Sequence, residues 1–194
     1  MKIILQKLFP CCIILFLHIT LSAQQSALSP EWEQMSRNAK EYENRGDYKN
    51  AIITYKQAIQ LVPGNIVLYK ELGNALYKSA NYDEAEQTIL PLISKKEADP
   101  ACYQLLAAIQ LARNETKKSK NTLQDGLTRF PSSGMLYFEL GNLYYSEQKP
   151  EAALDAWLDG ILKEPGYPRN YHEAGWHTWV VNMYCGDCFM GKYF

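Results

Sequence analysis

The chain is 194 residues long and carries 20 lysine or arginine residues against 21 aspartate or glutamate residues, so its formal net charge is −1. Its densest basic run is Lys117, Lys118 and Lys120, which is too small a patch to indicate nucleic-acid binding by phosphate neutralisation. We therefore expect a domain of ordinary size and no nucleic-acid partner.

The first segment, residues 1–23, has the pattern of a secretory signal peptide. Lys2 and Lys7 precede an apolar stretch that ends at Leu21, and Ser22 and Ala23 provide a small-residue cleavage site. The apolar stretch is shorter than the roughly 20 residues of a membrane span. We predict export to the periplasm or the extracellular space, with no integral span in the mature chain. An uncleaved N-terminal membrane anchor is the alternative.

After a short polar linker, residues 24–31, the chain becomes periodic. A tyrosine recurs every 34 residues, followed three residues later by leucine or alanine and then by a glycine or alanine: Tyr69, Tyr103, Tyr137, Tyr171. A fixed period of this length is typical of a repeat protein. The period divides residues 32–167 into four repeats, numbered here one to four: 32–65, 66–99, 100–133, 134–167.

The second half of each repeat is also regular. One slot is small in every repeat (Ala51, Ala85, Ser119, Ala153), and a large apolar residue follows four positions later (Tyr55, Ile89, Leu123, Trp157). Prolines 63, 131 and 165 close three of the repeats, since proline cannot continue a helix. Gly73 and Gly141 allow two helices to approach closely.

This pattern resembles the tetratricopeptide repeat. The resemblance implies an all-α fold, a right-handed α-solenoid of stacked antiparallel helix pairs, with about four 34-residue repeats plus a partial fifth. We expect helix almost throughout from Glu31 to Glu164.

Repeat two departs from the pattern. Glu97 occupies the slot of the closing proline, and Pro91 lies inside the second helix. An interior proline removes a backbone hydrogen bond. We expect a bend near Leu90 and a looser exit from Lys95 to Asp99.

Residues 168–194 begin a fifth repeat with Tyr171, Ala174 and Gly175 in register and then become an irregular aromatic tail. Four residues here are weak zinc-ligand candidates, in an order and spacing unlike common zinc fingers: His172, His177, Cys185, Cys188. A disulfide between Cys185 and Cys188 in an oxidising compartment is one alternative, and two incidental thiols are another. We predict no metal and no cofactor.

No catalytic constellation is present in the repeats. They contain no histidine, the commonest general base, and no glycine-rich phosphate loop. We therefore predict that the protein is not an enzyme.

In the tetratricopeptide repeat family the first helix of each repeat lines a concave groove that binds proteins or peptides. The resemblance thus implies a non-catalytic protein–protein interaction scaffold. The partner-binding residues predicted from the register mix apolar anchors with amide donors: Lys70, Asn74, Tyr77, Leu105, Phe138, Asn142, Tyr145.

Family members that grip a carboxylate-terminated chaperone tail use lysines, asparagines and an arginine at set positions. Lys70 and Asn74 match the first pair, but Leu105, Met135 and Glu139 fill the later slots. We therefore predict that the chain is not a carboxylate-tail clamp. Two alternatives to the scaffold remain open: a truncated or frame-shifted fragment of a longer repeat protein, or the targeting part of an enzyme whose catalytic domain is missing.

Overall fold

The structure, a computed structural model, describes residues 30–175. Its helices follow one another with short turns between them: α2 (Glu31–Asn44), α3 (Tyr48–Leu61), α4 (Ile66–Lys78), α5 (Tyr82–Ile93), α6 (Pro100–Ala112), α7 (Thr116–Arg129), α8 (Gly134–Ser146), α9 (Pro150–Lys163). No strand occurs within residues 30–175. The prediction of an all-α fold built from helix pairs is confirmed. The predicted signal peptide, linker start and aromatic tail lie outside the described residues.

The chain divides after Pro63 into two compact units. The first contains the pair α2 and α3, which packs through small side chains that include Ala39, Ala51 and Ala58. The buried Tyr55 hydroxyl donates a hydrogen bond of 2.8 Å to the buried Glu43 carboxylate. This bond satisfies a carboxylate that would otherwise be costly to bury.

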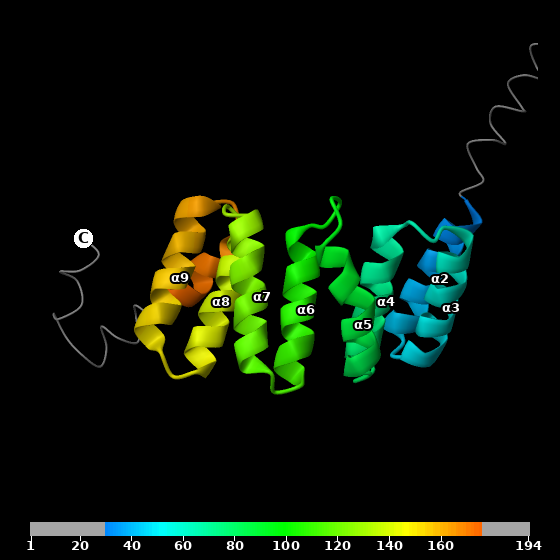
Figure 1. Cartoon of the computed structure of the whole chain (residues 1–194), viewed down its shortest axis with the longest axis horizontal. Coiled ribbons are helices and arrows are strands. Elements are labelled where there is room, and N and C mark those ends of the chain that lie inside the picture. Colours follow the sequence, from blue (N-terminus) through cyan, green and yellow to red (C-terminus); the bar gives the residue numbers. More distant parts are fainter. Residues whose placement is uncertain (1–29, 176–194) are drawn as a thin grey trace, which may run out of the picture. The chain divides into compact units, whose positions relative to one another are not determined.

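The second unit, from Gly64 on, contains α4 to α9, and each helix packs on the next in chain order (Figure 1). The first helices of repeats two, three and four are α4, α6 and α8, and the second helices are α5, α7 and α9. A Cβ added at Gly73 would overlap Ile89, and one added at Gly141 would overlap the Trp157 indole. The predicted close approach at these two glycines is confirmed.

The turn inside each repeat has one residue with positive φ, again at intervals of 34 residues: Gly46 (77°), Ala80 (62°), Asn114 (62°), Gln148 (59°). In repeat two the Asn81 N–H donates to the Leu76 carbonyl across this turn, which is a Schellman-type helix ending. Only Gly46 adopts this left-handed conformation without steric cost from a Cβ. Repeats two to four therefore rely on the hydrogen bonds of the turn to hold a less favourable backbone.

Repeat two ends differently from the others. Its second helix, α5, stops at Ile93, while α7 and α9 continue to Arg129 and Lys163, two positions further in register. Pro91 lies in the last turn of α5, where its missing N–H removes one helical hydrogen bond close to the early end of the helix. The bend expected near Leu90 stays a prediction. Residues 94–99 then form an irregular exit, as the missing proline predicts.

The end of α5 is held by a residue from repeat three. The Arg129 guanidinium donates to the carbonyls of Ile93 at 2.6 Å, Lys95 at 2.7 Å and Lys96 at 3.2 Å. These carbonyls have no partner within a helix, so a five-donor side chain suits them. Arg129 thus stabilises the end of the second helix in repeat two, where the other three repeats have a closing proline.

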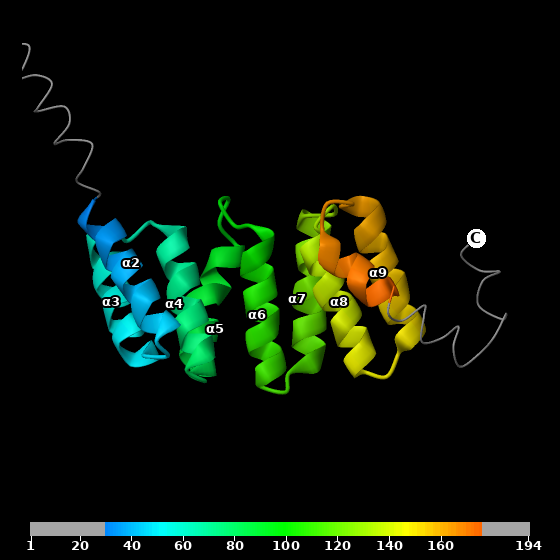
Figure 2. The same cartoon turned by 180° about the vertical axis from the view of Figure 1, so that it is seen from behind.

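The fifth repeat begins with helical residues 168–175, seen beside α8 and α9 in Figure 2. Asn170 is fully buried at the position that Leu68, Cys102 and Leu136 occupy in the preceding repeats. Its Nδ2 donates to the Gly134 carbonyl at 3.0 Å, while Oδ1 finds no hydrogen-bond partner within the described chain. The start of the fifth repeat therefore docks with a polar residue where the others use an apolar or thiol side chain.

Candidate partner-binding surface

The seven predicted binding residues lie on the first helices of the second unit. Lys70, Asn74 and Tyr77 are in α4. Leu105 is in α6, and the remaining three, Phe138, Asn142 and Tyr145, are in α8. Helix α6 packs against both α4 and α8, so the register prediction does place the seven on neighbouring helices.

Phe138 is a core residue in this structure. It is 6% exposed and packs in a cluster with Trp157 and Ala174. The Tyr167 ring meets it edge-on at 6.1 Å, and the Arg169 guanidinium lies 4.7 Å from its centroid. Its burial argues against the predicted role as an exposed anchor. The covering residues belong to the exit of repeat four and the fifth repeat, which register alone could not place.

Lys70 is committed to an internal ion pair with Asp99, which caps the N-terminus of α6 by accepting from the Cys102 N–H at 3.1 Å. Burial acts to raise the pKa of Asp99, but the hydrogen bonds from Lys70 and from Cys102 together hold that pKa below its ordinary value. Lys70 therefore contributes its charge to an ion pair at the junction between repeats two and three.

Tyr145 is the most accessible of the predicted aromatic anchors, with 55% of its surface exposed. Its ring lies 6.2 Å from that of Trp157. Tyr77 is half-buried and its ring lies 5.9 Å from that of Tyr82. Leu105, Asn74 and Asn142 are also half-buried. Tyr77 and Tyr145 thus remain the aromatic residues available to a partner.

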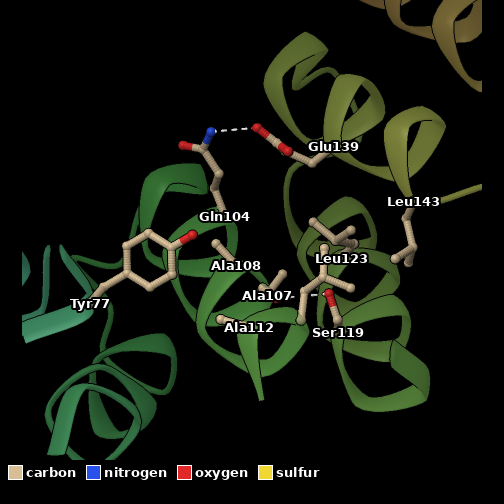
Figure 3. A pocket seen from close by; sticks show the side chains of 10 residues that line it. Tyr77, Gln104, Ala107, Ala108, Ala112, Ser119, Leu123, Glu139 and Leu143 are labelled. Atoms are coloured by element: carbon tan, nitrogen blue, oxygen red, sulfur yellow. Dashed lines mark hydrogen bonds between the residues drawn. The ribbon is translucent and has the colours of Figure 1, made fainter. Parts of the chain in front are cut away.

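A hollow of about 350 Å³ lies over α6 and is called the α6 hollow here (Figure 3). Its lining comes from α4, α6, α7 and α8: Tyr77, Gln104, Ala107, Ala108, Leu111, Ala112, Ser119, Leu123, Glu139, Leu143. Tyr77 forms one wall with its hydroxyl pointing toward α6, and Glu139 stands on the opposite side (Figure 3). The Gln104 Nε2 donates to Glu139 Oε1 at 2.7 Å.

The hollow exists because repeat three carries small residues where its neighbours carry larger ones. Ala108 occupies the position of Asn74 in repeat two and Asn142 in repeat four. Ala112 likewise replaces Lys78 and Ser146. These differences between the repeats are visible in the sequence, whereas the register of a single position indicates only which way it faces.

No metal site is evident within residues 30–175, where no three histidine, cysteine or acidic side chains cluster. His172 is exposed, with its Nδ1 3.2 Å from Glu173 Oε1. His177, Cys185 and Cys188 lie outside the described residues, so the zinc and disulfide alternatives stay predictions. Cys102 is a free, buried thiol whose pKa is raised, chiefly by burial.

None of the helices from α2 to α9 is long and apolar enough to span a membrane. Among curated proteins, the chain is similar to human protein O-mannosyl-transferase TMTC1, with 23% identity over 138 residues. The match covers 69% of this chain and 16% of that protein. The chain therefore spans about a sixth of the length of this relative.

Among solved structures, a thermophilic tetratricopeptide protein of Thermus thermophilus, TTC0263, superposes with a TM-score of 0.63 at 14% identity, over 77% of this chain and 82% of that one. YrrB, described as a TPR protein with an unusual peptide-binding site, gives a TM-score of 0.51 at 16% identity, over 76% of each chain. At this level of identity the likeness concerns the fold.

Two family models, both described as tetratricopeptide repeat, match residues 44–109 and 105–170. Together they span most of the helices described above, with the small slots and the left-handed turns that recur every 34 residues. The chain belongs to the tetratricopeptide repeat family.

Proposed function

We propose that the protein is a non-catalytic scaffold that binds a protein or peptide segment across the first helices α4, α6 and α8. The α6 hollow carries the proposal, because it is a concave site lined by side chains from three consecutive repeats. Tyr145 adds an exposed aromatic ring on α8, the kind of side chain enriched in binding hot spots. The peptide-binding site named for YrrB supports a peptide partner by analogy.

Binding is tested by affinity capture with the purified chain and its Tyr77→Ala, Tyr145→Ala double variant. Truncating an aromatic hot-spot residue costs about 2 kcal/mol or more, close to thirtyfold in affinity. We expect the double variant to keep its helicity and lose the partners that the wild type retains. Tyr171→Ala is a matched control, since Tyr171 is an equally exposed tyrosine in the start of the fifth repeat. If the double variant retains its partners at wild-type strength, the binding site does not include Tyr77 and Tyr145.

The proposal also places the protein outside the cytoplasm, in the periplasm or secreted. Its support is the charged, apolar and small-residue pattern of residues 1–23. Sequencing the N-terminus of the native product should find Gln24. Recovery of an intact Met1 from the cytosolic fraction would rule out cleavage and export.

A second candidate function is the targeting part of an enzyme, which takes its support from the similarity to part of a human O-mannosyl-transferase. In that case the native gene product is larger than the 22.3 kDa of this sequence. Intact-mass measurement of the native protein separates the two candidates. A mass at or below 22.3 kDa favours the scaffold.

A further inference from the structure

We propose that the α6 hollow receives a lysine or arginine side chain of the partner segment, with Glu139 as its counter-charge. The inference rests on the proposed function, because it names the chemistry of the segment that the first-helix face binds. Three observations support it: the single negative charge of the lining, the shape of the hollow, and the hydrogen bonding of the Glu139 carboxylate.

Glu139 provides the single formal charge among the ten residues that line the hollow. Within the described chain its carboxylate accepts one hydrogen bond, from Gln104, and pairs with no cation. Gln104 fixes the carboxylate without neutralising it, since an amide carries no charge. Lys70, a cation on the neighbouring helix α4, already pairs with Asp99.

The remaining lining suits the long stem of a basic side chain. Ala107, Ala108 and Leu111 form an apolar surface on α6, and Leu143 extends it on α8. Lysine and arginine bury their methylene groups along such a surface while the charged end reaches a polar partner. The Tyr77 hydroxyl on the opposite side points toward α6 and adds a hydrogen-bond acceptor for the charged end. The volume of about 350 Å³ equals that of roughly ten waters at about 30 Å³ each, which leaves room for a long side chain.

Other occupants fit less well. An acidic side chain or a chain-terminal carboxylate would bring a second negative charge toward Glu139, where like charges repel. A purely apolar side chain would strip water from the Glu139 carboxylate without replacing its interactions, which is costly for a charged group. A basic side chain alone satisfies both the carboxylate and the apolar floor.

The probe is a random-sequence peptide library displayed on phage and selected on the purified chain. We expect the selected peptides to share a lysine or arginine at one position. A labelled selected peptide then gives a dissociation constant by fluorescence anisotropy. Glu139→Gln, which keeps the size of the side chain and its bond to Gln104, should weaken that affinity about tenfold and reduce its salt dependence.

Two protein variants and one peptide variant control the measurement. Glu97→Gln removes the same charge from an exposed site in the exit of repeat two and should leave binding unchanged. Ala108→Asn fills the hollow with the residue that repeats two and four carry there, and should also weaken binding. Replacing the basic residue of the peptide by methionine tests the same pair against wild-type protein, so the result does not depend on how a variant folds.

The outcomes separate this inference from the function on which it rests. Peptides that bind with no shared basic residue, or with an affinity that Glu139→Gln and the methionine peptide leave unchanged, overturn the basic-residue pocket and leave the scaffold function in place. Failure to select any peptide above background counts against both. A shared basic residue together with the expected losses supports both.

Discussion

Repeats two and four use the same contact between their helices but close their ends in different ways. In both, a glycine of the first helix meets a large side chain of the second, Gly73 with Ile89 and Gly141 with Trp157. Repeat four ends locally, with Pro165 after α9 and the Glu164 Oε2 accepting from the Gly134 N–H at 2.6 Å. Repeat two has no such proline, and its end is bonded to Arg129 of the next repeat.

The comparison shows that one repeat can transfer a local task to its neighbour. A closing proline acts through the backbone of its own repeat, and it acts whether or not the next repeat is folded. The Arg129 bonds form only when α7 is in place. The end of α5 therefore depends on the repeat that follows it, repeat three. The end of α9 depends less on the residues that follow it, 168–175.

The largest effect is expected where the two repeats are most alike. In Gly141→Ala the new methyl group overlaps the rigid ring of Trp157, so we expect a loss of about 2–3 kcal/mol in the free energy of unfolding. In Gly73→Ala it overlaps Cδ1 and Cγ1 of the buried Ile89, a smaller side chain than Trp157, and the better helix propensity of alanine offsets part of the strain, leaving a smaller loss of about 1–2 kcal/mol. Urea unfolding of both variants measures the difference, and equal losses would show that ring rigidity does not matter here.

A smaller effect tests the exit of repeat two. Arg129→Met keeps the stem but removes three hydrogen bonds to carbonyls, so we expect a loss of about 1–2 kcal/mol and faster amide exchange in the last turn of α5. Lys163 occupies the same position in repeat four and makes no such bond within the described residues, so Lys163→Met is the matched control. A stability change of the same size in both variants would contradict the special role of Arg129.

The stability of the junction between repeats two and three should also depend on pH. The pKa of Asp99 is lowered in the folded state, so its contribution to stability is complete above the unfolded value of about 3.9 and is lost as the pH falls through the folded value. Asn caps helices well but does not titrate. The stability gap between wild type and Asp99→Asn should therefore narrow from about pH 7 to about pH 3. A gap that stays constant with pH would mean that folding does not lower the pKa of Asp99.

The smallest effect concerns the turns, where repeats two and four should behave alike. Ala80 and Gln148 both have positive φ, which costs about 1–2 kcal/mol for a residue with a Cβ, while glycine adds an entropic cost of about 0.5–1 kcal/mol. Ala80→Gly and Gln148→Gly should each raise stability by about 0.5 kcal/mol. Melting temperatures that shift in opposite directions would contradict this expectation. They would show that the turns of repeats two and four differ in backbone strain.

The fold was predictable because one pattern recurs in every repeat. The small and large slots around Gly73 and Gly141 specify the helix contacts, and α2 begins at Glu31 and α9 ends at Lys163, within one residue of the expected limits for the four repeats. The early end of α5 was less predictable. Pro91 indicated a disturbance there, but the bond from Arg129 joins residues more than thirty positions apart and follows no repeat rule.

The candidate site was only partly predictable. The position of a residue within the 34-residue repeat predicts the helix face on which it lies. It does not predict which other side chains cover that face. Tyr167, Arg169 and Ala174 cover Phe138, and Asp99 pairs with Lys70, and neither relation follows from the repeat register. The negative charge of Glu139 underlies both the prediction against a carboxylate-tail clamp and the proposed preference of the α6 hollow for a basic side chain.

The α6 hollow also bears on how such a protein can diversify. Its wall, floor and carboxylate come from repeats two, three and four in that order: Tyr77, then Ala108 and Ala112, then Glu139. Duplicating repeat three would keep the contact between small and large slots in each helix pair and would leave an Arg129 beside the end of α5. Such a rearrangement would nevertheless separate the three parts of the hollow. Genetic exchange of whole repeats can thus preserve folding while erasing recognition, and point substitutions at three or four positions can create a new specificity in an unchanged array.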